Sequence, residues 1–217
     1  MELLLISLLG GVLALDGTSV GQFMVSRPLV AGALAGWAVG EPATGVLIGA
    51  VLELYLLVSF PSGGARFPEG ASATVVAVAS AAVVEAPEAA ALGVAMGLIW
   101  GQVGGFTISL LRRMNGQFVP EPATASSRTV SIAHRLALGF DLIRGVVLTF
   151  GGVVIGRGLV QALAGSWPLP MDDTSGLLLV GGAVSAGILL RSLGGFRRRS
   201  VLFAAGLALG FIGTRLF

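Results

Sequence analysis

Long apolar stretches interrupted by short polar clusters run along the whole chain. A helix needs about 20 apolar residues to cross the ~30 Å hydrocarbon core of a bilayer, so segment length separates full spans from shorter pieces. The second half of the chain holds segments that are long enough or nearly so. The expected spans are residues 89–111, 136–163, 174–190 and 201–217.

The first 90 residues have a different pattern, in which the apolar runs are only about half as long. These runs are residues 1–15, 28–40, 46–60 and 71–84, separated by polar clusters such as DGTSVGQ and PSGGARFPEG. Half-length pieces are typical of broken helices and re-entrant hairpins, whose irregular backbone is tolerated only where protein or a water-filled cavity surrounds it. We therefore expect a solute site in this part of the chain.

Composition places the chain in a membrane. Of its 217 residues 55% are hydrophobic and only 11% are charged, whereas about a quarter of a soluble domain is charged. The chain has no cysteine and a single histidine, which excludes a disulfide, a thiolate metal site and a histidine metal cluster. We predict an all-α, polytopic integral membrane protein with about six to eight membrane segments, including re-entrant hairpins, and no cofactor.

Arginine marks the expected cytoplasmic side. All 13 basic residues are arginines, and they concentrate in residues 112–135 and 191–199. Because arginine in short loops favours the cytoplasm, both stretches are predicted to face it. Residues 112–135 are also the expected cytoplasmic linker between a site-bearing half, residues 1–111, and C-terminal transmembrane helices, residues 136–217. The net charge of only +2 does not indicate a nucleic-acid partner.

Small residues recur at four-residue intervals, a spacing that lets helices approach closely. General helix packing is the simpler interpretation, and a surface on which helices slide is the alternative. The glycines with this spacing are Gly32, Gly36, Gly40, Gly45, Gly49, Gly97 and Gly101.

Ionisable side chains in apolar segments are the candidates for chemistry, because each costs at least ~2.5 kcal/mol to insert and persists only when paired or functional. These groups are Asp16, Arg27, Glu53, Arg66 and Glu69. One hypothesis is that they form two structural ion pairs inside a helix bundle.

The alternative is that such groups surround a polar solute. Sugars suit this setting, because carboxylates accept hydrogen bonds from hydroxyls and a glutamine or arginine serves the remaining lone pairs. The predicted substrate-binding residues are Asp16, Gln22, Arg27, Glu53 and Glu69.

Other polar and aromatic residues have simpler expectations. Asp141 and Arg144 lie one helical turn apart and are expected to form an intrahelical ion pair. For His134 a solvated loop position is the favoured interpretation, and a phosphoryl-accepting role is the alternative. The tryptophans are expected to anchor at the lipid interface, with stacking on a sugar as the alternative, and they are Trp37, Trp100 and Trp167.

Three successive stretches of the first half resemble one known family. They are DGTSVGQFMVSRPLVAG from Asp16, GEPATGVLIGAVLEL from Gly40, and GGARFPE ending at Glu69. They resemble enzyme IIC, a membrane component of the mannose/fructose/sorbose-type sugar phosphotransferase system. The resemblance lies in the order of the motifs, which are RPL, a short loop with an acidic residue, TG, an LE dipeptide, a glycine turn and an acidic residue after proline. Arg27, Glu53 and Glu69 match the family's motifs.

The resemblance implies sugar uptake across the bacterial cytoplasmic (inner) membrane as the IIC permease subunit of a phosphoenolpyruvate-dependent phosphotransferase system. It implies a membrane IID subunit as partner, soluble IIB and IIA phosphocarrier subunits, and a trimer of IIC/IID pairs. Phosphoryl transfer would belong to IIB, so this chain would be a transport subunit and not an enzyme. Two alternatives remain, namely a sugar facilitator or secondary transporter uncoupled from phosphorylation, and a non-transporting membrane scaffold.

Overall fold

The computed structural model describes residues 1–57, 59, 65–86, 88–121, 125–192, 194, 200–201, 204–206 and 208. All regular elements among these residues are helical, which confirms the predicted all-α class. In chain order they are α1 (Glu2–Thr18), α2 (Pro28–Val39), α3 (Pro42–Leu56), α4 (Gly70–Ala81), α5 (Ala89–Gln117), α6 (Ser127–Leu163), the 3-10 helix η1 (Ala164–Ser166) and α7 (Met171–Ser192). The span expected at 201–217 and the PSGG turn fall largely outside the described residues.

Helix length divides the chain as its apolar runs predict. Three of the described helical segments are long and apolar enough to cross a membrane, and they comprise α5, α6 with η1, and α7. By contrast α2, α3 and α4 have 12, 15 and 12 residues, or roughly 18 to 22 Å at 1.5 Å per residue. These half-length helices therefore end inside the thickness that α5 and α6 cross.

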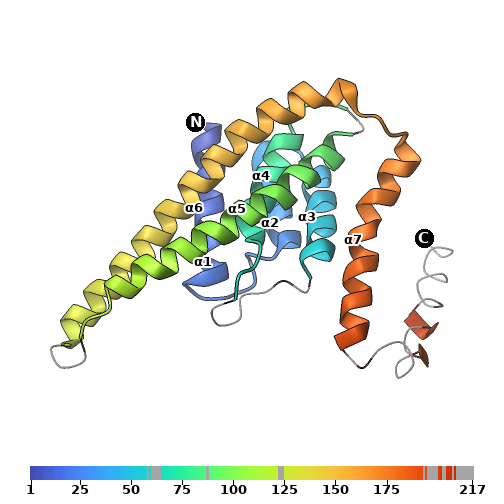
Figure 1. Cartoon of the computed structure of the whole chain (residues 1–217). Helices are drawn as coiled ribbons and strands as arrows, with labels where there is room; N and C mark the ends of the chain where they lie inside the picture. Colours follow the sequence, from blue (N-terminus) through green and yellow to red (C-terminus); the bar gives the residue numbers. More distant parts are fainter. Residues whose placement is uncertain are drawn as a thin grey trace.

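Helix α4 is the central element of the fold. Every residue from Ala71 to Ala81 is buried, and α1, α2, α3, α5 and α6 all pack against this helix (Figure 1). Its sequence, GASATVVAVASA, consists only of small and β-branched residues. Such side chains let five neighbours approach a helix that is apolar all round.

Helices α2 and α3 form a close hairpin that turns at Gly40, whose φ of 82° is a left-handed value suited to glycine. Gly36 faces Gly45 across the hairpin. A Cβ on Gly36 would lie 2.7 Å from the carbonyl oxygen of Glu41 and 2.8 Å from the Cα of Gly45. The glycine series thus serves close packing inside the hairpin, in agreement with the simpler interpretation.

Helices α5 and α6 run antiparallel and extend together beyond the short helices (Figure 1). Much of the stretch 112–135 expected as a linker is helical, because α5 continues to Gln117 and α6 begins at Ser127. The side chains of Ser126 and Thr129 form a capping box that starts α6. The division of the chain into two parts joined by a cytoplasmic linker stays a prediction.

Trp100 corrects the expectation that each tryptophan anchors at the lipid interface. Its Nε1 donates a hydrogen bond to the carbonyl oxygen of Leu148 at 3.1 Å, so this indole joins α5 to α6. Trp167 donates to Thr174 at 2.8 Å, whereas Trp37 is exposed as a lipid-facing residue would be. An indole N–H that is partly buried between helices needs an acceptor, and the neighbouring helix supplies it to Trp100.

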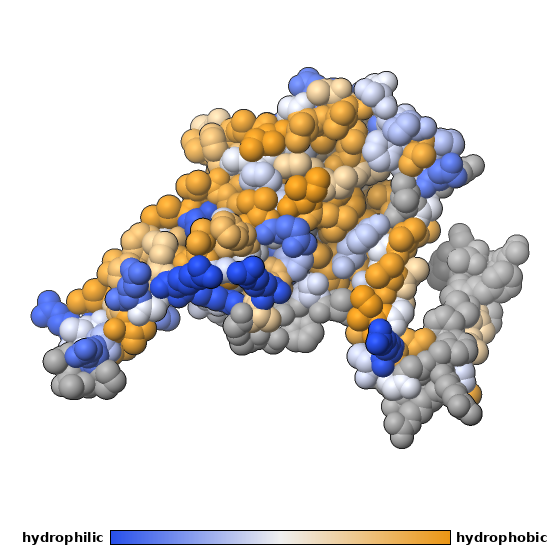
Figure 2. Space-filling model, in the orientation of Figure 1, coloured by the Kyte–Doolittle hydropathy of each residue, from blue (hydrophilic) through white to orange (hydrophobic). Residues whose placement is uncertain are grey.

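Helix α7 lies at the edge of the fold and packs against α3 (Figure 1). The hydroxyl of Ser185 donates to the carbonyl oxygen of Leu54, and Gly181 lies against the ring of Tyr55. Apolar side chains cover much of the visible surface, with hydrophilic ones both toward the lower end and at the top and upper right (Figure 2). The end of α5, the start of α6 and the end of α7 all lie toward the lower end, as two arginine-rich stretches on one side of a membrane require.

Candidate functional site

The ends of four helices surround a cavity of about 80 Å³. Helices α1 and α3 end at this cavity, and α2 and α4 begin there. A volume of this size holds several water molecules. Polar residues supply part of its wall, and they are Thr18, Ser26, Arg27, Glu53, Ser59 and Glu69.

The cavity lies level with the middle of the long helices. On one side the backbone N–H of Glu69 donates to the carbonyl oxygen of Gly101 at 2.9 Å. Gly101 lies near the centre of residues 89–111, which contain no charged residue. The half-length helices therefore bring their polar ends near the middle of the membrane, where irregular backbone is tolerated only around a protected or water-filled space.

Glu69 is the most buried charged residue of the cavity wall, with 3% of its surface exposed. It is the N-cap of α4, and its carboxylate accepts hydrogen bonds from the backbone N–H of Ser72 at 3.1 Å and from the Ser72 hydroxyl. Gly104 of α5 makes room for it, because a Cβ there would lie 2.8 Å from the Cβ of Glu69. No described basic residue forms an ion pair with Glu69, and the first turn of α4 supplies the hydrogen bonds that hold its carboxylate.

Arg27 and Glu53 form an ion pair in the same wall. The second oxygen of Glu53 accepts the backbone N–H of Leu29 at 3.3 Å. Arg27 is the N-cap of α2 and makes no side-chain cap itself, so Glu53 caps this helix from the opposite arm of the hairpin. The hypothesis of structural ion pairs therefore holds for Arg27 and Glu53 but not for Glu69.

Asp16 organises the loop between α1 and α2. Its Oδ1 accepts the backbone N–H of Phe23 at 2.6 Å, and its Oδ2 accepts that of Ser26 at 3.0 Å. The loop needs such support, because Gln22 and Met24 have φ values of 53° and 66°, which side-chain-bearing residues rarely adopt. Asp16 thus holds the wall residue Ser26 in place without lining the cavity itself.

The structure brings together three of the five predicted site residues, namely Arg27, Glu53 and Glu69. Asp16 reaches the cavity through the loop, and Gln22 is exposed on that loop and is not a wall residue. His134 is also exposed, but it lies in helix α6 and not in a loop, because α6 already begins at Ser127.

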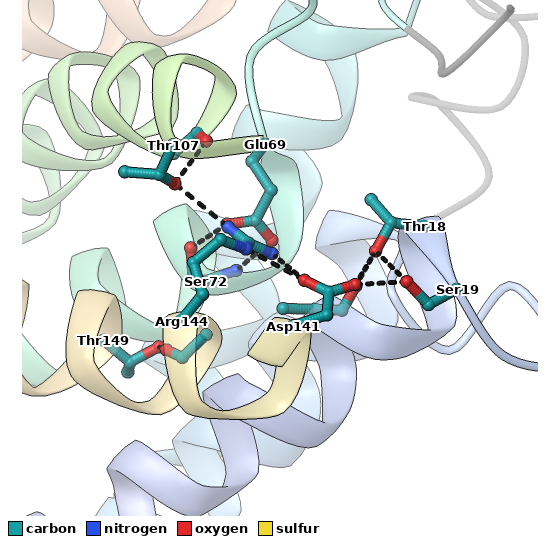
Figure 3. Close-up of polar contacts among 11 residues, drawn as sticks. Thr18, Ser19, Glu69, Ser72, Thr107, Asp141, Arg144 and Thr149 are labelled. Atoms are coloured by element: carbon teal, nitrogen blue, oxygen red, sulfur yellow. Dashed lines mark hydrogen bonds and ion pairs between the residues drawn. The ribbon is translucent and has the colours of Figure 1, made fainter. Parts of the chain in front are cut away.

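A buried polar network lies beside the cavity (Figure 3), and local sequence spacing predicts only the pair at its centre. As expected, Arg144 pairs with Asp141; Nη2 lies 2.8 Å from Oδ1, and Nε donates to the same oxygen at 2.9 Å. The other oxygen of Asp141 accepts from the hydroxyls of Thr18, at 2.6 Å, and Ser19. Arg144 also donates to Thr107 at 3.1 Å. The network joins α1, α5 and α6 and fixes Thr18 in the cavity wall.

Comparison with known proteins identifies one family, described as "PTS system sorbose-specific iic component", which matches residues 1–215. The chain is 26% identical over 208 residues to the PTS system sorbose-specific EIIC component of Klebsiella pneumoniae, a match that covers 92% of this chain and 77% of the relative. It is 29% identical over 162 residues to the Fructose permease IIC component of Bacillus subtilis (strain 168), covering 73% of this chain and 59% of that one. It is 24% identical over 173 residues to the PTS system mannose-specific EIIC component of Escherichia coli (strain K12), covering 77% and 64%.

The fold also matches a solved structure described as "Structure of membrane protein". The TM-score is 0.75 at 20% identity, and the match covers 99% of this chain and 92% of that chain. The likeness therefore extends over the whole helical arrangement. By length, the chain spans less than two thirds of the fructose and mannose relatives.

Proposed function

The chain belongs to the sorbose-specific IIC component family of the sugar phosphotransferase system, and on that premise we propose that its mid-membrane cavity binds the transported sugar. The family comprises permease components of mannose-type sugar uptake systems. The chain is accordingly an integral protein of the bacterial inner membrane and a transport component, and other subunits carry out the phosphoryl transfer.

Glu69 is the observation that carries the proposal. It is a buried carboxylate in the cavity wall, at the depth of Gly101, and it has no basic partner among the described residues. A carboxylate has about four lone-pair sites, of which Ser72 uses two here. The remaining sites suit the hydroxyl groups of a neutral sugar, whose charge-assisted hydrogen bonds compensate for the loss of water.

Arg27 and Glu53 contribute from the hairpin side of the cavity. Arginine has five N–H donors, and the pair to Glu53 leaves several of them for sugar oxygens. Asp16 acts through the loop that it holds, and Gln22 joins the site if that loop folds over a bound sugar. The predicted binding set thus divides into wall residues and loop residues with different roles.

As a phosphotransferase IIC component the chain works with other components of its system. We propose that the nearest of these is a membrane IID subunit, that soluble IIB and IIA subunits supply the phosphoryl group, and that IIC/IID pairs assemble as trimers. The loop between α1 and α2 supports a membrane partner, because Phe23 is 78% exposed on irregular backbone beside the mid-membrane cavity. Lipid does not cover such backbone, whereas protein does.

The test compares Glu69→Gln and Glu53→Gln in the purified complex by measuring sugar binding and thermal stability on the same samples. Glu69→Gln should weaken sugar binding by about 10- to 100-fold, the equivalent of a charge-assisted hydrogen bond worth roughly 1.5 to 3 kcal/mol. It should leave most of the stability, because the glutamine carbonyl can still accept from Ser72. Glu53→Gln should lower stability more, since it removes the charge opposite Arg27 and weakens the cap of α2.

Glu41→Gln is the matched control, because Glu41 is an exposed carboxylate in the turn between α2 and α3, away from this cavity. It should change neither property. Normal sugar binding by Glu69→Gln, whatever its stability, would defeat the proposed site.

A further inference from the structure

A second cavity, of about 200 Å³, adjoins the first one. Phe67 and Pro68 line both cavities and so form their common wall. The two differ in charge, because two carboxylates, of Glu53 and Glu69, outnumber the one arginine, Arg27, in the wall of the first. Arg66 and Gln102, both exposed, are the polar residues described in the wall of the second. The second cavity is therefore suited to an anion where the first is suited to a neutral solute.

Arg66 is exposed, and the described part of the chain offers it no counter-charge. It forms no ion pair or hydrogen bond with any described residue, and its cavity includes Gly105 of α5. Gly105 precedes Arg112, the first arginine at the end of α5, by seven residues, and therefore lies roughly 10 Å closer to the middle of that helix. An unpaired arginine at that depth is costly unless water or an anion meets it.

A second arginine is fixed on the same segment. The guanidinium of Arg112 lies 5.5 Å from the centre of the Phe67 ring, a cation–π distance. Its Nη1 also donates to the carbonyl oxygen of Ala65 at 3.0 Å. Arg112 thus holds the segment that carries Arg66 and adds positive potential at this end of α5, where Figure 2 shows hydrophilic side chains gathered below the apolar surface.

We propose that Arg66, with Gln102 and the nearby Arg112, forms a binding site for a phosphoryl group at the cytoplasmic exit of the sugar cavity. This inference rests on the proposed function, because a sugar that becomes a phosphate ester can no longer be held against Glu53 and Glu69. A guanidinium binds phosphate oxygens through two parallel hydrogen bonds, and the Gln102 amide offers a further donor. Phe67 and Phe106 provide apolar surface beside them.

The phosphoryl group has two sources with the same chemistry. One is the phosphorylated sugar as it leaves, and the other is the phosphorylated side chain of the soluble partner subunit. The experiment therefore measures both in the full membrane complex reconstituted in lipid nanodiscs. The ligands are free sugar, a hexose phosphate and inorganic phosphate, followed by the soluble phosphocarrier subunit with and without its phosphoryl group.

Arg66→Gln should weaken hexose phosphate binding by about 10- to 100-fold and leave the affinity for free sugar unchanged. Arg66→Lys should bind hexose phosphate more weakly than the unmodified protein but more tightly than Arg66→Gln, because lysine keeps the charge but loses the planar guanidinium group. Gln102→Ala is a second variant that leaves both arginines intact, and it should weaken the same ligand to a smaller extent. Arg113→Gln is the matched control, since Arg113 is exposed next to Arg112 and does not line the cavity.

If only the phosphorylated subunit loses affinity in Arg66→Gln, the site binds the partner's phosphoryl group, and the inference holds for that source. If no phosphorylated ligand responds to Arg66→Gln or Gln102→Ala, or if Arg113→Gln has an equal effect, the inference is overturned. Failure of the unmodified complex to bind free sugar would instead defeat the proposed function. The dependence of inorganic phosphate binding on Arg66 is measured in the absence of sugar. Failure of the phosphoryl site and failure of the sugar site can therefore be distinguished.

Discussion

Asp141→Asn should destabilise the protein far more than so small a change in shape suggests. Asp141 is 0% exposed, and the side chain of its partner Arg144 is 9% exposed. The amide oxygen of asparagine can still accept a hydrogen bond from Thr18 or Ser19, but it no longer balances the guanidinium. The substitution therefore leaves a buried positive charge among α1, α5 and α6.

The expected magnitude follows from the contacts that remain. Arg144 would keep its hydrogen bond to Thr107 at 3.1 Å, and no other described carboxylate forms an ion pair with it. Breaking a buried pair by removing one partner costs about 3 to 5 kcal/mol, a large share of the roughly 5 to 15 kcal/mol that stabilise a typical protein. Replacing both charges, as in Asp141→Asn with Arg144→Met, removes the stranded charge and should regain most of the loss.

The assay is unfolding in mixed micelles for both single variants and the double variant, so that the coupling between the two sites is measured directly. Glu2→Gln is the control, because Glu2 and Arg157 form a pair whose side chains are 59% and 27% exposed. It should cost less than about 1 kcal/mol. A double variant that is less stable than Asp141→Asn alone would refute the reasoning, because the stranded charge would then not be the cause.

Two other predictions concern packing and orientation. Gly36→Ala should cost about 1 to 3 kcal/mol of stability, because the added Cβ would meet backbone atoms of Glu41 and Gly45 within 2.8 Å. The control is Gly139→Ala, whose Cβ would have nothing within 4 Å and which should be neutral or slightly stabilising. Equal melting temperatures for the two variants would contradict the hairpin packing. Single cysteines at Ser127 and Ser192 should react with an impermeant thiol reagent only from the cytoplasmic side, and one at Ser166 only from the outside. Labelling of the Ser127 and Ser192 variants by the impermeant reagent in intact cells would show that the predicted orientation is wrong.

The helices could be predicted largely from the sequence, because apolar run length and the positions of proline and glycine determine them. Pro28 and Pro42 are the first residues of α2 and α3, and Gly40 is the turn between them. The extensions of α5 and α6 past their apolar runs were not predictable in this way. A helix satisfies its own backbone hydrogen bonds in water as well as in lipid, so it need not end where the apolar residues do.

The site could be predicted only in part. Arg27, Glu53 and Glu69 stand out because charges in apolar segments are costly, and all three line one cavity. The role of Asp16 was hidden, since its partners are backbone N–H groups of Phe23 and Ser26 that carry no sequence signal. The contact between Thr18 and Asp141 spans 123 positions, and no local spacing marks such a pair.

Two of the cavity carboxylates also explain how broken helices and a polar site depend on each other. Helices α2 and α4 both begin at the cavity, and their first turns are capped by Glu53 and Glu69 respectively. A helix N-terminus carries roughly half a positive charge, and its free N–H groups donate to these carboxylates near mid-membrane. Glu69 has no basic partner among the described residues, which is why we propose that its remaining lone pairs accept from a solute. A full-length helix would place that N-terminus in water, so the half-length of α4 is what brings the Glu69 carboxylate to the depth of the cavity, where we propose that the sugar binds.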